Sequence, residues 1–192
     1  YRVDNPLALL EPAVNLREEY NDNYDLSSVD QDTVWETALE PSIRLSRRGD
    51  LWDISATERL VASQVNGQEG QDTVDNYFNV AAKRPFERGS FDAKASLIND
   101  TTFQNEELDF DTGVTTRQVD RTRNSLSLGG EYMLNETNWL EASLDYAMVS
   151  YDARPLDGLY DYDTLTPGLR IVHQYDQQTQ VFGILSHSDT KY

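Results

Sequence analysis

The stretch that decides the fold runs from residue 125 to residue 148. It reads SLSLGGEYML over 125–134 and WLEASLDYAM over 139–148, with the break Asn135–Asn138 between them. Every second residue in both halves is apolar or a glycine, and those between are mostly Ser, Glu or Asp. This alternation predicts two strands with one apolar and one polar face. A helix would place apolar residues at i, i+3, i+4 and i+7, which this stretch does not do.

The same period of two extends along the chain and predicts an all-β protein. The predicted strands cover, roughly, 12–21, 32–46, 51–64, 74–84, 90–98, 114–134, 138–150, 162–174 and 179–188. Residues 1–11 are expected to form an N-terminal extension, and residues 12–192 the antiparallel strands. Pro41 and Pro167 interrupt predicted strands, so a bulge or a shifted boundary is expected at each. The apolar face of the third strand also changes side near Leu60.

The connections between these strands alternate between short and long. Short ones lie near 47–50, 85–89, 135–138 and 176–178, and long ones near 22–32, 66–73, 99–113 and 151–161. Tight turns at one end and long loops at the other are typical of up-and-down outer-membrane β-barrels, whose turns are periplasmic and whose loops are extracellular. A soluble sandwich has no reason to alternate in this way.

Charge follows the same division. The four segments 21–32, 66–75, 99–112 and 151–163 together carry a net charge of −15, out of −18 for the whole chain. The short turns are close to neutral. An acidic rim at only one end indicates a molecule with a defined direction.

Composition excludes several classes of protein. There is no Cys, so disulfide scaffolds, Cys-ligated zinc and thiol nucleophiles are absent. A phosphate backbone needs a basic face, so an acidic chain is not expected to bind nucleic acid. No apolar run reaches the length of about 18 residues that a transmembrane helix needs. The 11 Tyr, 6 Phe and 3 Trp argue against disorder.

Aromatic residues gather near the predicted strand ends, where aromatic girdles flank the apolar band of membrane barrels. They are Tyr20, Trp35, Trp52, Tyr77, Phe91, Tyr132, Trp139, Tyr151, Tyr162 and Tyr175. The alternative is that these rings fill a β core.

Short motifs add a resemblance. The segment Pro12–Asn23 contains Tyr20-x-Asp22-Asn23, and Glu40–Leu45 reads EPSIRL. Later, Tyr132–Thr137 forms a turn that is followed by alternating apolar residues from Leu140. These features resemble a family of bacterial outer-membrane β-barrels associated with exopolysaccharide or exosortase (PEP-CTERM) systems. The resemblance implies a barrel fold and an outer-membrane location, with exported polysaccharide as a candidate partner, but it implies no mechanism.

The strand count is nine, whereas single-chain bacterial barrels normally have an even number. The favoured explanation is that the chain is the N-terminal portion of a larger barrel. The alternative is an eight-stranded barrel with one strand wrongly assigned.

The face assignments predict which side chains would line a lumen and which would meet lipid. The lumen-facing set consists of charged residues: Glu36, Glu40, Arg44, Asp53, Arg59, Asp92, Lys94, Glu131, Glu141 and Asp145. The lipid-facing set is apolar: Leu126, Leu128, Leu140, Leu144, Tyr146 and Met148. A charged interior fits a water-filled channel or a lumen closed by pairing across strands, and excess acid would favour cations in a pore.

No catalytic set is predicted, and the chain is expected not to be an enzyme. Ser186 and His187 are neighbours in a strand, so their side chains point to opposite faces. A cofactor is not expected, although a Ca²⁺ or Mg²⁺ ion could bind the acidic loop of Asp22, Asp25, Asp30 and Asp32 through carboxylate oxygens. The spacing of these residues does not match an EF-hand.

The sequence thus predicts an integral outer-membrane β-barrel in contact with lipid and lipopolysaccharide, which acts as a porin or channel for polar solutes or exported polysaccharide. Two alternatives stay open. One is a soluble, secreted all-β carbohydrate-binding module, and the other is a structural or adhesin-like barrel with a closed lumen.

Overall fold

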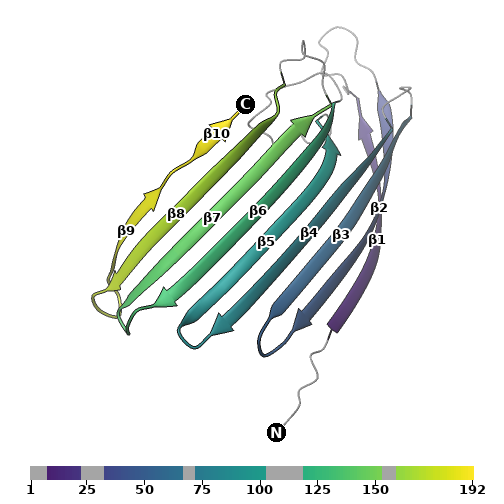
Figure 1. The fold of residues 1–192 in the computed structure, drawn as a ribbon. Coiled ribbons are helices and arrows are strands. Elements are labelled where there is room, and N and C mark those ends of the chain that lie inside the picture. Colours follow the sequence, from purple (N-terminus) through teal and green to yellow (C-terminus); the bar gives the residue numbers. More distant parts are fainter. Residues whose placement is uncertain (1–7, 23–32, 67–71, 103–118, 153–158) are drawn as a thin grey trace.

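A computed structural model describes residues 8–22, 33–66, 72–102, 119–152 and 159–192. These residues form one ten-stranded sheet in which every pair of neighbouring strands is antiparallel (Figure 1). The strands are β1 (Ala8–Asn21), β2 (Val34–Arg48), β3 (Asp53–Asn66), β4 (Thr73–Phe86), β5 (Gly89–Thr101), β6 (Asp120–Met133), β7 (Asn138–Tyr151), β8 (Tyr162–Gln174), β9 (Gln180–Ser186) and β10 (Asp189–Lys191).

Strand order in space follows chain order, so the topology is up-and-down. The short turns after β2, β4, β6 and β8 lie together at one end of the sheet, and the strand ends that the long connections join lie at the other (Figure 1). Within the described residues the sheet is open, with β1 at one edge and β9 and β10 at the other. The described residues contain no helix that is long and apolar enough to cross a membrane.

The strands lie where the alternation predicts them, with small differences at their ends. β1 begins at Ala8 rather than at residue 12, so part of the predicted N-terminal extension is strand. It pairs with β2 along its whole length, from Ala8 opposite Arg47 to Asn21 opposite Val34. The pairing partner, which local sequence does not reveal, therefore determines where this strand starts.

The two prolines interrupt pairing without producing a bulge. On β2, the ladder to β3 skips Glu40 and Pro41 and then resumes in the same register, while the ladder to β1 continues. On β8, the Pro167 carbonyl accepts a hydrogen bond from the His187 N–H at 3.2 Å, and Pro167 has no N–H to return. The edge strand therefore breaks between β9 and β10, although both keep one register against β8.

The predicted face change near Leu60 does not occur. β3 pairs in an unbroken register with β4, so Val61 and Val65 stay on the same face as Asp53 and Arg59. Val61 and Val65 are buried, at 6% and 4% exposure, next to the long connections. Apolar residues appear on the polar face there because that end is covered, not because the strand turns over.

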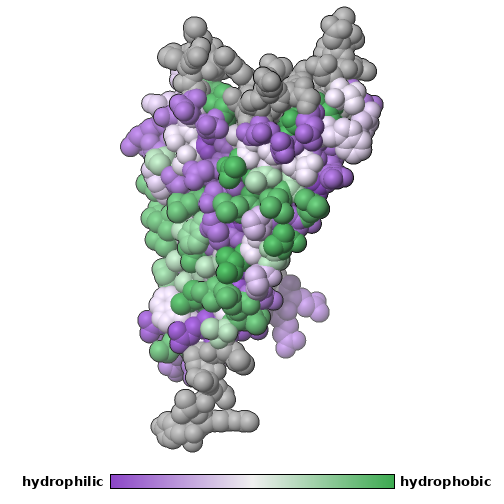
Figure 2. Space-filling view, turned by 90° about the vertical axis from the view of Figure 1, so that its right-hand side faces the viewer, coloured by the Kyte–Doolittle hydropathy of each residue, from purple (hydrophilic) through white to green (hydrophobic). Residues whose placement is uncertain are grey.

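Large apolar side chains lie mostly on the outside of this single layer. The only cluster of buried apolar residues in the described part is Val34 with Val65. By contrast, Leu39, Leu97 and Leu126 are each more than 40% exposed. Figure 2 shows hydrophobic residues as a band at mid-height, with hydrophilic residues above and below it. Such a band matches the lipid-facing surface of a membrane barrel.

A soluble sandwich is excluded for the described residues. A sandwich buries the apolar face of one sheet against a second sheet. Here all ten strands belong to one sheet, and strands contact substantially only their neighbours in it.

Candidate functional site

Register decides which side chains share a face, because residues that pair directly across two strands point to the same side. Starting from Asp53, the pairs Asp53–Lys83, Lys83–Asp92 and Asp92–Gly129 link β3 to β6. The same tracing places all ten predicted lumen-facing residues on this one face, called here the polar face.

The six predicted lipid-facing residues share the opposite face. Leu126 pairs with Tyr146 and Leu128 with Leu144, and the others follow the same parity. This apolar face also carries an aromatic contact at each end of the sheet. Tyr20 and Trp35 lie 5.1 Å apart between ring centroids beside the long connections, and Phe86 and Tyr132 lie 6.5 Å apart beside the short turns.

The predicted aromatic girdle needs correction. Tyr20, Trp35, Phe91 and Tyr132 lie on the apolar face, as a girdle requires. A second group lies on the polar face instead: Tyr77, Trp139, Tyr151 and Tyr162. Nearness to a strand end therefore does not identify girdle residues. Side chains alternate between the two faces along a strand, so the position in this alternation decides the face.

The predicted lumen-facing set lacks several charged residues of the polar face, most of them basic. They are Glu11, Arg17, Glu19, Arg48, Asp75, Lys83, Asp100, Arg121, Arg123 and Arg170. The polar face is therefore closer to charge balance than the predicted set. Period-two alternation carried into the ends of the strands would have found most of them.

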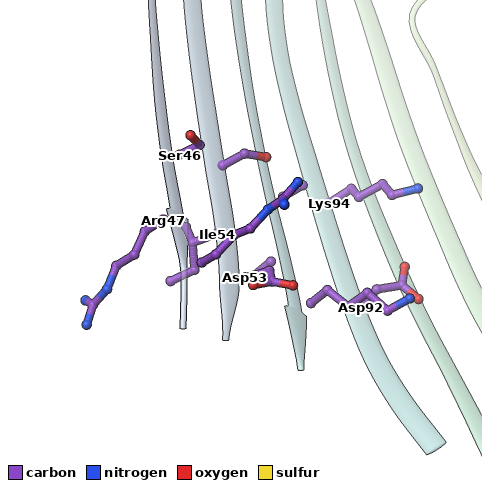
Figure 3. Close-up of a pocket in the computed structure, with 11 residues that line it drawn as sticks. Ser46, Arg47, Asp53, Ile54, Asp92 and Lys94 are labelled. Carbon is purple, nitrogen blue, oxygen red and sulfur yellow. The ribbon is translucent and has the colours of Figure 1, made fainter. Parts of the chain in front are cut away.

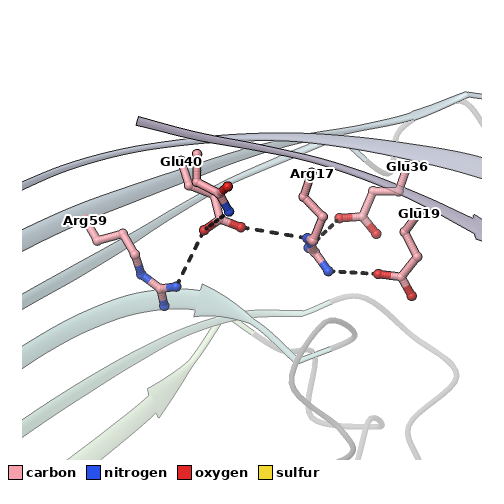
Figure 4. A network of polar contacts seen from close by, with 6 residues as sticks. Arg17, Glu19, Glu36, Glu40 and Arg59 are labelled. Atoms are coloured by element: carbon pink, nitrogen blue, oxygen red, sulfur yellow. Dashed lines mark hydrogen bonds and ion pairs between the residues drawn. The ribbon is translucent and has the colours of Figure 1, made fainter. Parts of the chain in front are cut away.

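One network of ion pairs crosses β1, β2 and β3 (Figure 4). Arg17 contacts Glu19 at 2.8 Å, Glu36 at 3.2 Å and Glu40 at 3.7 Å. Arg59 reaches Glu40 from the other side, at 3.9 Å. Both arginine side chains are more than 40% exposed, so water screens each pair and its contribution is about 0.2–1 kcal/mol.

A second network, on β5 and β6, is buried. Arg121 donates Nε–H to Asp100 Oδ1 at 3.0 Å and Nη2–H to Oδ2 at 3.1 Å, in the two-point geometry that arginine and carboxylate favour. Arg123 donates to the same Oδ2 at 2.6 Å. The Asp100 and Arg121 side chains are 0% and 2% exposed. The polar face is therefore covered beside the long connections.

Asp75 on β4 lies near this network and is 1% exposed. Its carboxylate lies close to the backbone of Thr101 on β5. The hydroxyl of Ser63 on β3, also buried, has no hydrogen-bond partner in the described part of the chain. Buried polar groups normally have hydrogen-bond partners, so a water molecule is the expected partner of the Ser63 hydroxyl.

The third network lies near the short turns on β7 and β8. Arg170 donates to both oxygens of Glu141, at 3.3 and 3.0 Å, and Trp139 donates its indole N–H to Glu141 at 2.9 Å. The Arg170 guanidinium also lies 4.6 Å from the centre of the Phe182 ring. Glu131, directly opposite Glu141 on β6, belongs to none of these contacts.

Between these charged ends, the middle of the polar face carries small side chains. Most bear a hydroxyl or amide: Ser55, Thr57, Asn79, Ser96, Ser125, Ser127, Thr164 and Thr166. Some bond to a neighbour on the next strand, as Ser127 does to Asp145 and Thr166 to Ser188. Small side chains leave space above the sheet.

Two hollows on the sheet near the short turns share Lys83 and Asp92 and form one trough across the strands. The first, of about 460 Å³, also takes in Arg48, Asp53 and Lys94 (Figure 3). The second, of about 470 Å³, extends over Gly129, Ser143, Gly168 and Ser186. Charged side chains border one half, and small residues form the floor of the other.

The predicted cation loop falls almost wholly outside the described residues. Of its four acidic residues only Asp22 is described, and it is exposed. Asp25, Asp30 and Asp32 lie in the segment 23–32, outside the described residues. In the rest of the chain as described, no three His, Asp or Glu side chains are grouped to hold a metal ion. A Ca²⁺ or Mg²⁺ site in this loop stays a prediction.

Comparison with known proteins rests on structure alone, since no protein-family model and no curated protein matches the sequence. The chain is similar to outer-membrane-expressed OmpT of Vibrio cholerae, with a TM-score of 0.53 and 11% identity over 96% of this chain and 70% of that one. For a loop L8 deletion mutant of OmpT, the TM-score is 0.52 and the identity 11%, over 94% of this chain and 57% of that one. For in-vitro folded OmpT in its trimer form, the TM-score is 0.52 and the identity 12%, over 91% of this chain and 54% of that one.

The chain thus spans 54% to 70% of the length of these structures. One prediction is corrected here, namely that the chain is not an enzyme. The likeness to OmpT removes the basis for that exclusion, because a fold shared at 11–12% identity does not separate enzymes from channels. What the likeness shows is the fold. The open antiparallel sheet with its exposed apolar face is that of a bacterial outer-membrane β-barrel, which agrees with the predicted location.

Proposed function

We propose that the chain forms part of the wall of an outer-membrane channel for polar solutes. The belt of small hydroxyl and amide side chains across the middle of the polar face carries this proposal. A packed barrel interior is filled by large, interdigitating side chains. Ser, Thr and Asn at mid-height instead leave room for water and offer it hydrogen bonds.

The ion pairs among the described residues lie along the wall. Each joins residues on one strand or on two neighbouring strands, as Arg17–Glu36, Arg121–Asp100 and Arg170–Glu141 do. They hold charged side chains in place on the polar face.

Selectivity for cations is expected to be modest. The additional basic residues, such as Arg48, Lys83 and Arg170, offset much of the acid on the wall. The acidic long connections remain, and rings of acidic side chains favour cations. Exported polysaccharide stays a candidate solute on the sequence resemblance alone. Contact with lipopolysaccharide phosphates through shared divalent cations is a separate prediction from the acidic loops.

A second candidate is a barrel whose lumen is closed near the long connections. The observation in its favour is the burial of polar residues at that end, with Asp75, Asp100 and Arg121 all 3% exposed or less. In this alternative the molecule is structural and conducts nothing.

Conductance separates the two. The complete gene product, folded into detergent and added to planar bilayers, should give stepwise currents with a weak preference for cations in a salt gradient. If channels do not appear with protein that is folded, as judged by a heat-dependent shift on a gel, the closed barrel is correct and the proposal fails.

A further inference from the structure

We propose that the trough beside the short turns binds zwitterionic solutes, meaning amino acids or small peptides that carry one ammonium and one carboxylate. This inference rests on the proposed function, since it assigns a solute class to the polar face. The trough crosses β2 to β9, from Arg48 at one end to Ser186 at the other.

Charges of opposite sign alternate strand by strand in the first half of the trough. Arg48 pairs with Asp53, Asp53 with Lys83, and Lys83 with Asp92. Neighbouring strands lie about 4.8 Å apart, so each basic head stands one strand from an acidic one. The two charged groups of a small peptide can meet such a pair at once.

Lys83 and Asp92 are free to take these groups. The ion pairs that the described residues form involve other side chains, such as Arg59, Glu40 and Glu141, and neither Lys83 nor Asp92 has a partner in any of them. Lys83 is exposed and Asp92 half-buried. A lysine ammonium would bind the solute carboxylate, and an aspartate carboxylate would bind the solute ammonium, each through charge-assisted hydrogen bonds.

The second half of the trough provides the space. Gly129, Ser143, Gly168 and Ser186 follow one another across β6 to β9 in the same row of the sheet. A Cβ atom at Gly129 would lie 2.6 Å from Asp92 Oδ1, and one at Gly168 would lie 2.6 Å from Ser143 Oγ. Because the glycines have no side chain, Asp92 can lie over Gly129 and Ser143 over Gly168. The absence of larger side chains at these positions leaves space above the sheet.

The trough also has a transverse polarity. Among the polar-face residues that line the trough, basic side chains are in excess on β2 to β5, with Arg48, Lys83 and Lys94 against Asp53 and Asp92. Acidic side chains are in excess on β6 to β8, with Glu131 and Glu141 against Arg170. A solute with a single charge is attracted at one side of the trough and repelled at the other. A zwitterion can be attracted at both sides, through its two opposite charges.

Saturation-transfer difference NMR on the folded, full-length barrel in deuterated detergent at low salt tests the proposal. Glycylglycine is the zwitterionic probe, and N-acetylglycinamide is its uncharged counterpart of similar size. Glycylglycine should show saturable binding and N-acetylglycinamide none. The double variant Lys83→Gln with Asp92→Asn should weaken the glycylglycine affinity by about tenfold or more, as expected for losing hydrogen bonds between charged groups.

Two controls keep the result specific. Arg84→Gln removes one charge from the adjacent position on the apolar face and should leave the affinity unchanged. Gly168→Val should raise the floor and weaken binding, whereas Gly183→Val, where a Cβ would meet nothing within 4 Å, should not. All variants must show the heat-dependent gel shift of the folded barrel before they are compared.

The outcomes are distinct from those of the conductance test. Equal signals from both probes, or unchanged glycylglycine affinity in the double variant, overturn the zwitterion site even if the barrel conducts. Specific binding in a barrel that does not conduct supports the site and overturns the channel.

Discussion

At the scale of single residues, two short turns are held by the same pattern of side-chain-to-backbone hydrogen bonds, one through an aspartate and the other through an asparagine. The Asp176 Oδ1 atom accepts hydrogen bonds from the N–H groups of Gln178 and Thr179, both at 2.8 Å, in the turn from β8 to β9. Asn135 Oδ1 does the same for Thr137 and Asn138 in the turn from β6 to β7, at 3.0 and 2.9 Å. Only the first of these acceptors can titrate.

This difference predicts a pH dependence confined to one turn. The backbone N–H of Gln178 lowers the pKa of Asp176 below its ordinary value, and Thr179 adds to the effect. The folded pKa is depressed, so the stabilising contribution is present above the unfolded pKa and is lost as the pH falls through the folded pKa. Amide hydrogen exchange should therefore show Gln178 and Thr179 losing protection, relative to Thr137 and Asn138, as the solution is acidified.

Asp176→Asn provides the matched test. The variant keeps an acceptor oxygen but cannot titrate, so the difference in protection between the two turns should no longer depend on pH. If the turn after β8 still loosens with acid in this variant, the aspartate is not the cause.

At the scale of one strand, alternation with a period of two divides β6 between its two environments. Leu126 lies on the apolar face opposite Tyr146, and Ser125 lies on the polar face opposite Ala147. Both side chains are exposed in this single-layer sheet. The strand is therefore a direct probe of which face meets lipid.

Arginine placed at these two neighbouring positions should have unequal effects. On the lipid-facing side at mid-bilayer depth, Leu126→Arg should cost about 2–4 kcal/mol of folding free energy, since the charge must be taken out of water. Ser125→Arg should be much milder because it faces the small-residue belt. Reversible urea unfolding in lipid vesicles measures both, and equal losses would contradict the assignment of faces.

At the scale of the whole molecule, the described sheet has two free edges, β1 and the strand formed by β9 and β10. An unpaired backbone edge in hydrocarbon is costly, so membrane barrels close. The OmpT structures that the sheet resembles are longer than this chain.

A closed barrel of paired strands should resist detergent denaturation until it is heated. Outer-membrane extracts of cells that express the complete gene product should show a band that migrates differently before and after boiling. The same protein should be absent from the soluble fraction. A soluble product without such a shift would contradict the membrane barrel itself.

Much of this architecture could be predicted from the sequence, because a strand between lipid and water must alternate residue by residue. The period of two, the turn residues and the unequal connections locate nearly every strand, including β6 and β7. The apolar and polar sets also share faces as predicted, since parity within a strand is a local property. An aromatic such as Tyr77, whose place near a strand end suggested a girdle, lies on the polar face by parity.

Only the tertiary structure decides which residues meet across strands, because pairing depends on register between segments far apart in the chain. Register brings Lys83 beside Asp92, joins Arg170 to Glu141, and aligns Gly129, Ser143, Gly168 and Ser186 into one floor. It also breaks the last strand opposite Pro167, which lacks the N–H that continuous pairing would need. The sequence by itself therefore determined which side chains of one strand share a face. Pairing between strands decided how these faces join and which residues form the trough and the networks, since hydrogen bonding of the backbone sets which side chains become neighbours.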